Sequence, residues 1–198
     1  MIKNVIFDIG NVLLDFCWKD HIARFGFQGE KADRIAQAMM LGPIWPKLDL
    51  GLESDDDILE QFVAHTPELE QEIRLVFSDL STIVREYEGS VDWIESLKAR
   101  GYHTYYLSNY GERIRREASK ELSFLSHMDG GIMSYTVHLA KPDPAIYQTL
   151  LDRYGLKAEE CVFLDDTVRN VEAAQALGIA GIVVTSQEQA KKELETLL

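Results

Sequence analysis

Cysteine, proline and long apolar runs are scarce in this sequence of 198 residues. Its 2 cysteines, Cys17 and Cys161, lie far apart without C-x-x-C spacing, so we expect buried free thiols and no disulfide, zinc site or redox pair. The 5 prolines and 13 glycines exclude collagen-like and low-complexity chains. No stretch approaches the roughly 18 apolar residues of a membrane span, and Asp8 interrupts the apolar N-terminal run. We therefore expect a cytoplasmic protein without a signal peptide or membrane span.

Positive charge is also scarce. The sequence has 20 Lys and Arg residues against 33 Asp and Glu residues, for a formal net charge of −13 at pH 7. Nucleic acids and anionic membranes attract basic proteins, so neither is expected as the main partner. A small molecule is expected instead, and no oligomeric state is predicted. The hydrophobic fraction of 46% suffices for a core, and the length predicts one domain, with or without an insertion.

Strand and helix patterns alternate in the C-terminal part of the chain. Residues 3–7 predict a first strand that is apolar on both faces, as in the centre of a parallel sheet. Further strands are expected at residues 104–107, 132–135, 161–164 and 182–184, with helices between them. Repeated strand–helix units imply an α/β fold, a Rossmann-like parallel sheet with helices on both faces. Residues 1–15 and 88–198 would form this core.

Residues 16–87, called the insertion below, interrupt the core after its first strand and contain no convincing strand. Ser54 and Asp57 have capping-box spacing, and Thr66-Pro67 is a second helix start. Spacings of three and four residues downstream predict one long helix, with its apolar stripe at Leu69, Ile73, Val76, Leu80, Ile83 and Tyr87. We therefore expect an all-helical insertion.

Polar residues stand at three of the expected strand ends: Asp8, Ser108-Asn109 and Asp165-Asp166. In an open parallel sheet these ends line one edge, where ligands bind at the switch in strand order. Carboxylates brought together there repel one another and call for a cation, and oxygen ligands favour Mg²⁺. Each residue alone is more often a turn former or a helix cap. Their order and placement together predict a site.

Four segments then carry a resemblance to a known family: FDIGNVLL at residues 7–14, YLSN at 106–109, KPDPAIY at 141–147 and FLDDTVRN at 163–170. In this order they resemble the motifs of the haloacid dehalogenase superfamily, and the insertion resembles the helical cap of one subfamily. The first and last motifs resemble the branch that includes α-D-glucose-1-phosphate phosphatase and, more distantly, the phosphatase domain of soluble epoxide hydrolase. The resemblance implies a hydrolase that acts on small phosphomonoesters with Mg²⁺ as its cofactor.

The resemblance also implies catalytic and substrate-binding roles. Asp8 would be the nucleophile that forms an aspartyl-phosphate. Ser108, with Asn109, would hydrogen-bond the transferring phosphoryl oxygens. Lys141 would supply positive charge to these oxygens and to the Asp8 carboxylate. Mg²⁺ and Lys141 would then make the pocket locally cationic in an acidic protein.

Metal binding is implied for Asp8, the Gly10 carbonyl and Asp166, with Asp165 as a direct or indirect ligand and Asn170 further out. Gly10 departs from the family pattern, in which a second Asp serves as general acid and base. Such help is typically worth about 10²–10⁴-fold in rate. Low activity, another proton donor, or a leaving group that departs unaided would each explain the glycine. We favour the third, which predicts an anomeric sugar phosphate such as glucose 1-phosphate. The same glycine disfavours a phosphomutase.

Two alternatives stay open. A 2-haloacid dehalogenase would use Asp8 on carbon without a metal, although it would have no use for Asp165-Asp166. A low-activity binding or regulatory protein would keep the fold without turnover. Trp45, Lys47 and Asp49 lie in a breaker-rich stretch of the insertion and are candidates to face the pocket. Aromatic residues of the insertion are expected mainly in its own core.

Overall fold

The computed structural model describes residues 1–198 and contains a five-stranded sheet in the order β5-β4-β1-β6-β7. All neighbouring strands are parallel. The strands are β1 (Asn4–Phe7), β4 (His103–Ser108), β5 (Gly130–Met133), β6 (Cys161–Asp165) and β7 (Ala180–Val183). Every residue of β1 is buried, as its apolar sequence predicts for the central strand.

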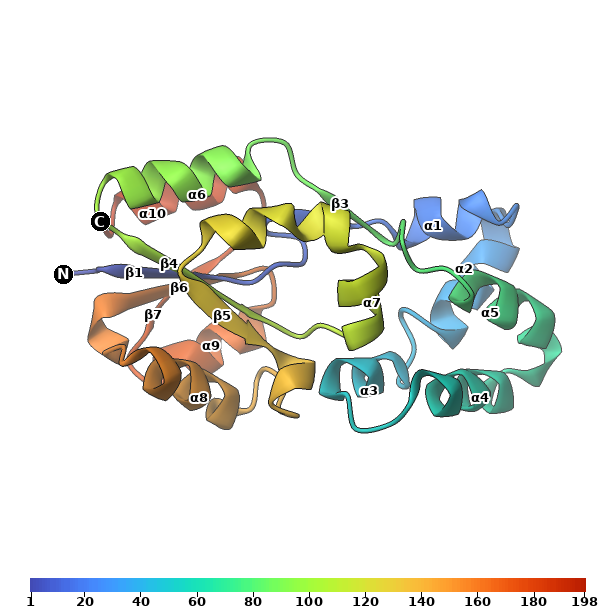
Figure 1. The fold of residues 1–198 in the computed structure, drawn as a ribbon. Coiled ribbons are helices and arrows are strands. Elements are labelled where there is room, and N and C mark those ends of the chain that lie inside the picture. The colour runs from blue at the N-terminus through green and yellow to red at the C-terminus, as the bar shows by residue number, and fades with distance from the viewer.

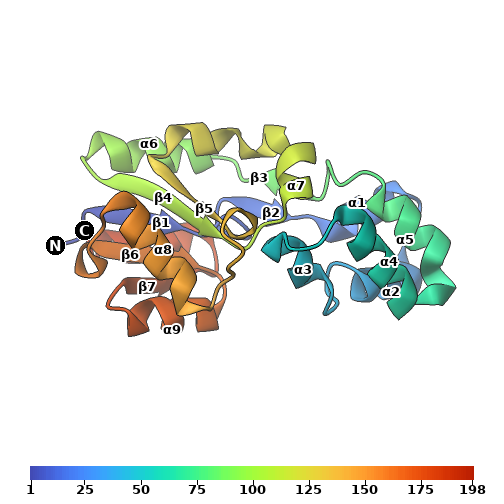
Figure 2. The same ribbon diagram turned by 60° about the horizontal axis from the view of Figure 1, so that its bottom comes forward.

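Helices cover both faces of the sheet. Successive side chains of a strand point to opposite sides, so the apolar strands present apolar side chains to both helical layers. Val5 and Phe7 share a hydrophobic cluster with α6 (Ser90–Ala99) and α10 (Gln187–Glu195). Ile6 faces the other way, in the cluster that includes α8 (Pro144–Tyr154) and α9 (Val168–Ala176). Figure 1 and Figure 2 show the strands between these two helical layers. The α/β fold expected from the sequence is confirmed.

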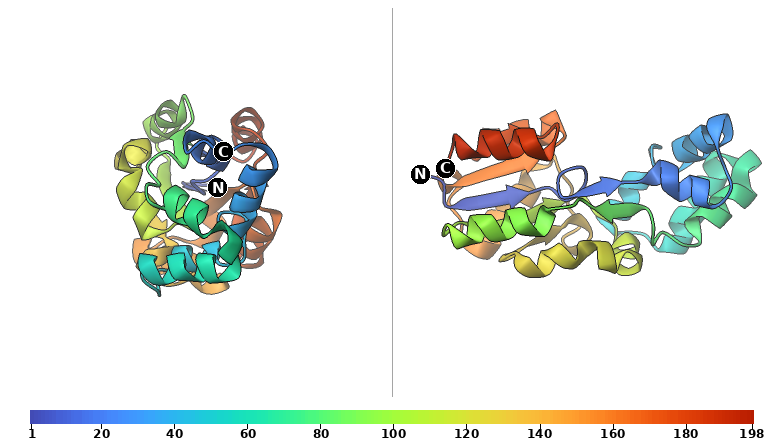
Figure 3. Two further views of the ribbon diagram at one scale, coloured as in Figure 1. Left: turned by 90° about the vertical axis from the view of Figure 1, so that its right-hand side faces the viewer. Right: turned by 90° about the horizontal axis from the view of Figure 1, so that it is seen from above.

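The helices of the insertion gather beyond the carboxyl ends of the sheet strands, while both chain termini lie at the opposite end (Figure 3). These helices are α1 (Trp18–Arg24), α2 (Gly29–Ala38), α3 (Trp45–Leu50), α4 (Asp55–His65) and α5 (Glu70–Phe77). The Ser54 hydroxyl accepts a hydrogen bond from the Asp57 backbone N–H at 3.1 Å, so the predicted cap of α4 is confirmed.

A two-stranded antiparallel ribbon joins the insertion to the core. It consists of β2 (Leu14–Phe16) and β3 (Val84–Glu86). The expectation that residues 16–87 contain no strand is therefore wrong. Strands of three residues are too short to show an alternating pattern, and pairing across a long sequence separation creates them.

The prediction of one long helix through residue 87 is also wrong. After the short 3₁₀ helix η1 (Pro67–Leu69), α5 ends at Phe77. The Asp79 carboxylate then accepts a hydrogen bond from the Ser81 backbone N–H at 2.9 Å, which forms a local turn in competition with the helix. Leu80 and Ile83 are buried as their spacing suggested, but they lie in this turn.

The remaining core helices follow the expected pattern with one exception. The helix expected between the strands at residues 104–107 and 132–135 divides into α7 (Glu112–Glu117) and the 3₁₀ segment η2 (Ser119–His127). Cys17 and Cys161 are both free and buried, which confirms the prediction for the thiols. None of the helices combines the length and the hydropathy needed to cross a membrane.

Candidate active site

The three strand ends singled out in the sequence meet at one edge of the sheet. Asp8 follows β1, Ser108 ends β4, and Asp165 ends β6. Strands β4 and β6 flank β1 on either side. The chain passes from β1 to β4 on one side and returns to β6 on the other, so Asp8 stands at the switch in strand order. One carboxylate oxygen from each of Asp8, Asp165 and Asp166 lies within 4.8 Å of the other two.

A buried lysine bridges two of these carboxylates. The Lys141 Nζ lies 2.9 Å from the Asp8 Oδ1 and 2.6 Å from the Asp165 Oδ2. Lys141 is only 3% exposed, and burial by itself lowers the pKa of a lysine. The charges of Asp8 and Asp165 outweigh this effect and raise the pKa of Lys141, so it stays charged.

The Asp8 carboxylate is held through one oxygen. Its Oδ1 accepts hydrogen bonds from the Ile9 backbone N–H at 2.7 Å and from the Ser108 hydroxyl at 2.6 Å, besides the ion pair with Lys141. Its Oδ2 has no partner in the protein. Burial raises the pKa of Asp8 to about 6, although Lys141 and Ser108 act in the opposite direction. The carboxylate is thus oriented, with one oxygen available, and a cation beside it would favour its ionised form.

Asp165 is completely buried and is engaged within the protein. Its carboxylate accepts hydrogen bonds from the Thr167 backbone N–H at 2.8 Å and from the Asn170 side-chain amide at 3.1 Å, in addition to the Lys141 ion pair. Asp165 therefore fixes the position of Lys141 behind Asp8. Asn170, which was expected further from the site, donates its hydrogen bonds to Asp165.

Asp166 turns toward the open side of the site. It accepts hydrogen bonds from the Asn11 side-chain amide at 2.9 Å and from the Thr167 hydroxyl at 3.3 Å, and it has no cationic partner. Asn11 has a φ of 55°, a left-handed conformation that Asn adopts more readily than most residues. Asn11 was not predicted as a site residue, although its place after Gly10 in the turn was a usable signal.

The donor set fits a magnesium ion. Three carboxylates share the edge with a single ammonium, so the ionised site carries excess negative charge. The available oxygens belong to Asp8 and Asp166, and Gly10 lines the same pocket, where its backbone carbonyl can contribute. An all-oxygen set of this kind suits Mg²⁺.

Asn109 holds the chain that carries the lysine. Its side-chain amide donates to the Lys141 carbonyl at 3.0 Å, and its Oδ1 accepts from the Lys141 backbone N–H at 2.8 Å. Asn109 also lines the pocket, so its predicted contact with a substrate stays a prediction beside this structural role.

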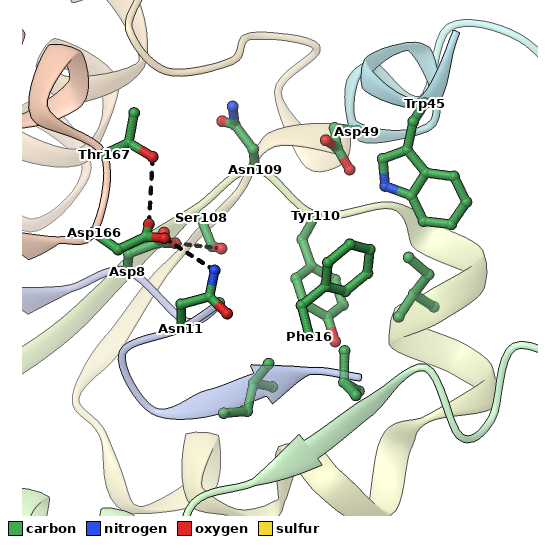
Figure 4. Close-up of a pocket in the computed structure, with 14 residues that line it drawn as sticks. Asp8, Asn11, Phe16, Trp45, Asp49, Ser108, Asn109, Tyr110, Asp166 and Thr167 are labelled. Atoms are coloured by element: carbon green, nitrogen blue, oxygen red, sulfur yellow. Dashed lines mark hydrogen bonds between the residues drawn. The ribbon is translucent and has the colours of Figure 1, made fainter. Parts of the chain in front are cut away.

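The edge of the sheet opens into a pocket of about 220 Å³ between the core and the insertion. In Figure 4, Asp8, Asp166, Asn11 and Ser108 group on one side of this pocket, and Phe16, Tyr110 and Trp45 lie on the other. The apolar side consists of Leu14, Phe16, Trp45, Val84, Tyr110 and Ile114. Lys141 and Asp165 do not line the pocket and lie behind Asp8.

Of the three candidates in the breaker-rich stretch, Trp45 and Asp49 line the pocket and Lys47 does not. Lys47 instead forms an ion pair with Glu53 at 3.2 Å. Trp45 packs between Phe16 and Phe62, with ring centroids 6.0 Å and 6.2 Å away. It therefore belongs to the core of the insertion and to the pocket wall at once.

Comparison with known proteins identifies the family of this chain. The family model described as haloacid dehalogenase-like hydrolase matches residues 2–178. Acyl-CoA dehydrogenase family member 10 of Mus musculus is 31% identical over 99% of this chain, which spans only 19% of that relative. Sesquiterpene phosphatase astK of Aspergillus oryzae is 26% identical, over 99% of this chain and 96% of the relative.

Among solved structures, a family enzyme of Bacteroides thetaiotaomicron in complex with magnesium and inorganic phosphate has the same fold. The TM-score is 0.72 at 22% identity, over 94% of this chain and 96% of that one. The match of the family model extends from β1 through α9, and the insertion and all four motifs lie within it. The chain therefore belongs to the haloacid dehalogenase-like hydrolases.

Proposed function

We propose that this hydrolase is a Mg²⁺-dependent phosphatase that cleaves a small phosphomonoester through an aspartyl-phosphate on Asp8. The observation that carries the proposal is the Asp8 carboxylate, which is held through Oδ1 by Ser108 and Lys141 and has Oδ2 without a partner. A nucleophile with one fixed and one available oxygen is oriented for attack before the substrate arrives.

In the proposed reaction, Asp8 attacks phosphorus, the bond from phosphorus to the leaving-group oxygen breaks, and an aspartyl-phosphate forms. Ser108 and Asn109 contact the transferring phosphoryl oxygens, and Lys141 supplies positive charge from behind Asp8. Water then attacks phosphorus, the bond between phosphorus and Asp8 breaks, and inorganic phosphate leaves with the carboxylate restored.

The proposed metal ligands are Asp8, the Gly10 carbonyl and Asp166, with Asp165 as an indirect contributor through Lys141 and Asn170. When bound, Mg²⁺ adds positive charge that stabilises the phosphoryl group during transfer. The phosphatase relative and the neighbour structure that holds magnesium and phosphate support this proposal.

The insertion is proposed to act as a cap, residues 16–87, over a catalytic core of residues 1–15 and 88–198. The pocket takes its walls from both parts, with Trp45 on the insertion and Tyr110 on the core. Closure of such a cap would exclude water during phosphoryl transfer and limit release of the product.

The decisive experiment is an aryl phosphate assay of the wild-type protein and of Asp8→Asn, each with Mg²⁺ or with EDTA. Hydrolysis that requires Mg²⁺ and falls at least about 10³-fold in Asp8→Asn supports the proposal. Activity that survives in the variant would exclude Asp8 as the nucleophile. Asp33→Asn, an exposed aspartate on α2, is the matched control.

An anomeric sugar phosphate is the candidate substrate that Gly10 favours. No acidic side chain stands at this position, and a sugar released from its anomeric carbon needs less protonation than an ordinary alcohol. Glucose 1-phosphate is then expected to turn over faster than glucose 6-phosphate. Equal or reversed rates would remove this candidate.

A 2-haloacid dehalogenase remains the alternative reaction, because an available Asp8 oxygen beside an apolar wall also suits attack on carbon. Halide release from 2-chloropropionate without metal, in the absence of phosphatase activity, would favour it. Inactivity in both assays would favour a binding or regulatory protein.

A further inference from the structure

Gly10 leaves an unfilled space beside the proposed nucleophile. A Cβ placed on Gly10 would meet no heavy atom within 4 Å, and the residue lines the pocket. Glycine has no side chain, so this position cannot deliver a proton to a leaving group at Asp8. For a leaving group that does not depart unaided, a proton donor has to come from another element of the pocket.

Asp49 on α3 reaches the same pocket from the insertion. Figure 4 shows its carboxylate on the far side of Ser108 and Asn109 from Asp8 and Asp166. It is the one acidic side chain that the insertion contributes to the pocket. It makes no hydrogen bond or ion pair with the protein, so neither oxygen is committed to a structural role.

The backbone around Asp49 is anchored to the core. The Ser134 hydroxyl donates a hydrogen bond to the Asp49 carbonyl, and the His138 Nδ1 lies 2.9 Å from the Leu50 carbonyl. Gly51, with a φ of 61°, packs so closely that a Cβ there would lie 2.9 Å from the Tyr135 Cβ. These contacts hold α3 against the core beside the pocket.

The electrostatic surroundings suit a group that both gives and takes a proton. Burial raises the pKa of Asp49 to about 7, and the charge of Asp8 acts in the same direction while Lys141 opposes it. Burial raises the pKa of the nearby Tyr110 phenol, and the charge of Asp49 acts in the same direction. Near neutral pH both protonation states are populated, which is the condition for efficient general acid–base catalysis.

Two titratable groups close to Asp49 in the chain or packed beside α3 have other partners. Lys47 is paired with Glu53, and the ring of His138 contacts the Leu50 carbonyl. The charges that face the Asp49 carboxylate are therefore those of Asp8 and Lys141 across the pocket.

We propose that Asp49 is the general acid and base of this enzyme and takes over the role that Gly10 cannot perform. In the first step Asp8 bonds to phosphorus, the bond to the leaving-group oxygen breaks, and Asp49 gives its proton to that oxygen. In the second step the ionised Asp49 takes a proton from the attacking water. The bond between phosphorus and Asp8 then breaks, which releases phosphate and leaves both residues in their starting states.

This inference rests on the proposed phosphatase function, and it is tested with Asp49→Asn and two substrates in the presence of Mg²⁺. For an alkyl phosphate, whose leaving group needs a proton, kcat/KM is expected to fall by about 10²–10⁴-fold. For 4-nitrophenyl phosphate, whose leaving group departs unaided, kcat/KM is expected to change by less than about 10-fold. The loss of the base also slows the second step, so one equivalent of 4-nitrophenol is expected as a burst.

Asp56→Asn, an exposed aspartate on α4, is the matched control and is expected to behave as wild type. An unchanged thermal midpoint of Asp49→Asn verifies that the fold is intact. Equal kcat/KM losses for both substrates, or no loss for either, would overturn the role of Asp49 while the phosphatase proposal stands. A wild-type protein inactive on both substrates would overturn the phosphatase proposal itself.

Discussion

The Lys141 ammonium lies 2.9 Å from the Asp8 Oδ1 in a region that water barely reaches. A second carboxylate, that of Asp165, lies 2.6 Å from the same ammonium. Removal of one member of a buried charge cluster leaves the others uncompensated, and this costs more than the net value of the ion pair. Lys141 therefore holds the site together as well as serving the proposed chemistry.

The first prediction concerns Lys141→Met, which keeps the length of the side chain and removes its charge. The free energy of unfolding is expected to fall by about 3–5 kcal/mol at pH 7, because Asp8 and Asp165 then face each other without a cation. Urea denaturation of the metal-free protein measures this change. Lys157→Met removes an exposed lysine without an ion pair and is expected to change stability by less than about 0.5 kcal/mol. Similar losses in the two variants would contradict the structural role of Lys141.

The second prediction concerns Asp166→Asn and the metal. Asp166 has only Asn11 and Thr167 as partners, so the metal-free variant is expected to be as stable as wild type. At Mg²⁺ concentrations 100 times the dissociation constant, wild type is expected to gain about 2.7 kcal/mol, or roughly 5–10 °C in Tm. Asp166→Asn is expected to lose most of this gain in thermal unfolding, whereas Asp33→Asn keeps it. A full Mg²⁺ response in Asp166→Asn would place the ion elsewhere.

The polar side of this site was predictable because its signals are local. Asp8 follows one short apolar strand and Asp165 ends another, and a parallel sheet brings the ends of neighbouring strands together. Two conditions were enough: the strands had to be recognised, and they had to be neighbours. The order β4-β1-β6 meets the second condition.

The apolar side was not predictable in the same way. Phe16 comes from the β2–β3 ribbon, Trp45 from the insertion and Ile114 from α7, and only tertiary packing brings them together. Asp49 was one of several candidates in a stretch without periodicity. Its approach to the pocket depends on how α3 rests on Ser134, which no local pattern encodes.

The third prediction follows from the apolar wall. Phe16 is half-buried and its ring centroid lies 6.0 Å from that of Trp45, so part of the ring is available to a substrate. Loss of this surface in Phe16→Ala is expected to raise KM for an aryl phosphate by roughly 10-fold, in line with the burial of part of an aromatic side chain. Steady-state kinetics measures the change. Phe27→Ala, away from the pocket, is expected to leave KM unchanged, and an unchanged KM in Phe16→Ala would show that the substrate does not reach this wall.

The fourth prediction concerns pH and a buried histidine far from the proposed chemistry. The ring of His21 on α1 is fully buried, with Nδ1 3.0 Å from the Thr82 hydroxyl and Nε2 3.3 Å from the Val76 carbonyl. A neutral ring satisfies both contacts, with Nε2–H donating to the carbonyl and Nδ1 accepting from the hydroxyl. Burial lowers the pKa of His21 below its usual value of 6.5, although the Val76 carbonyl acts in the opposite direction.

Since the folded protein binds this proton less tightly than the unfolded chain, stability is present above pH 6.5 and is lost as the pH falls below it. The slope contributed by His21 is at most about 1.4 kcal/mol per pH unit. In His21→Gln this contribution disappears, so the stability difference between wild type and variant should shrink as the pH is lowered from 7.5 to 5. Urea denaturation at several pH values measures it, with the exposed His65→Gln as the control. A difference that stays constant with pH would mean that His21 titrates alike in the folded and unfolded chain.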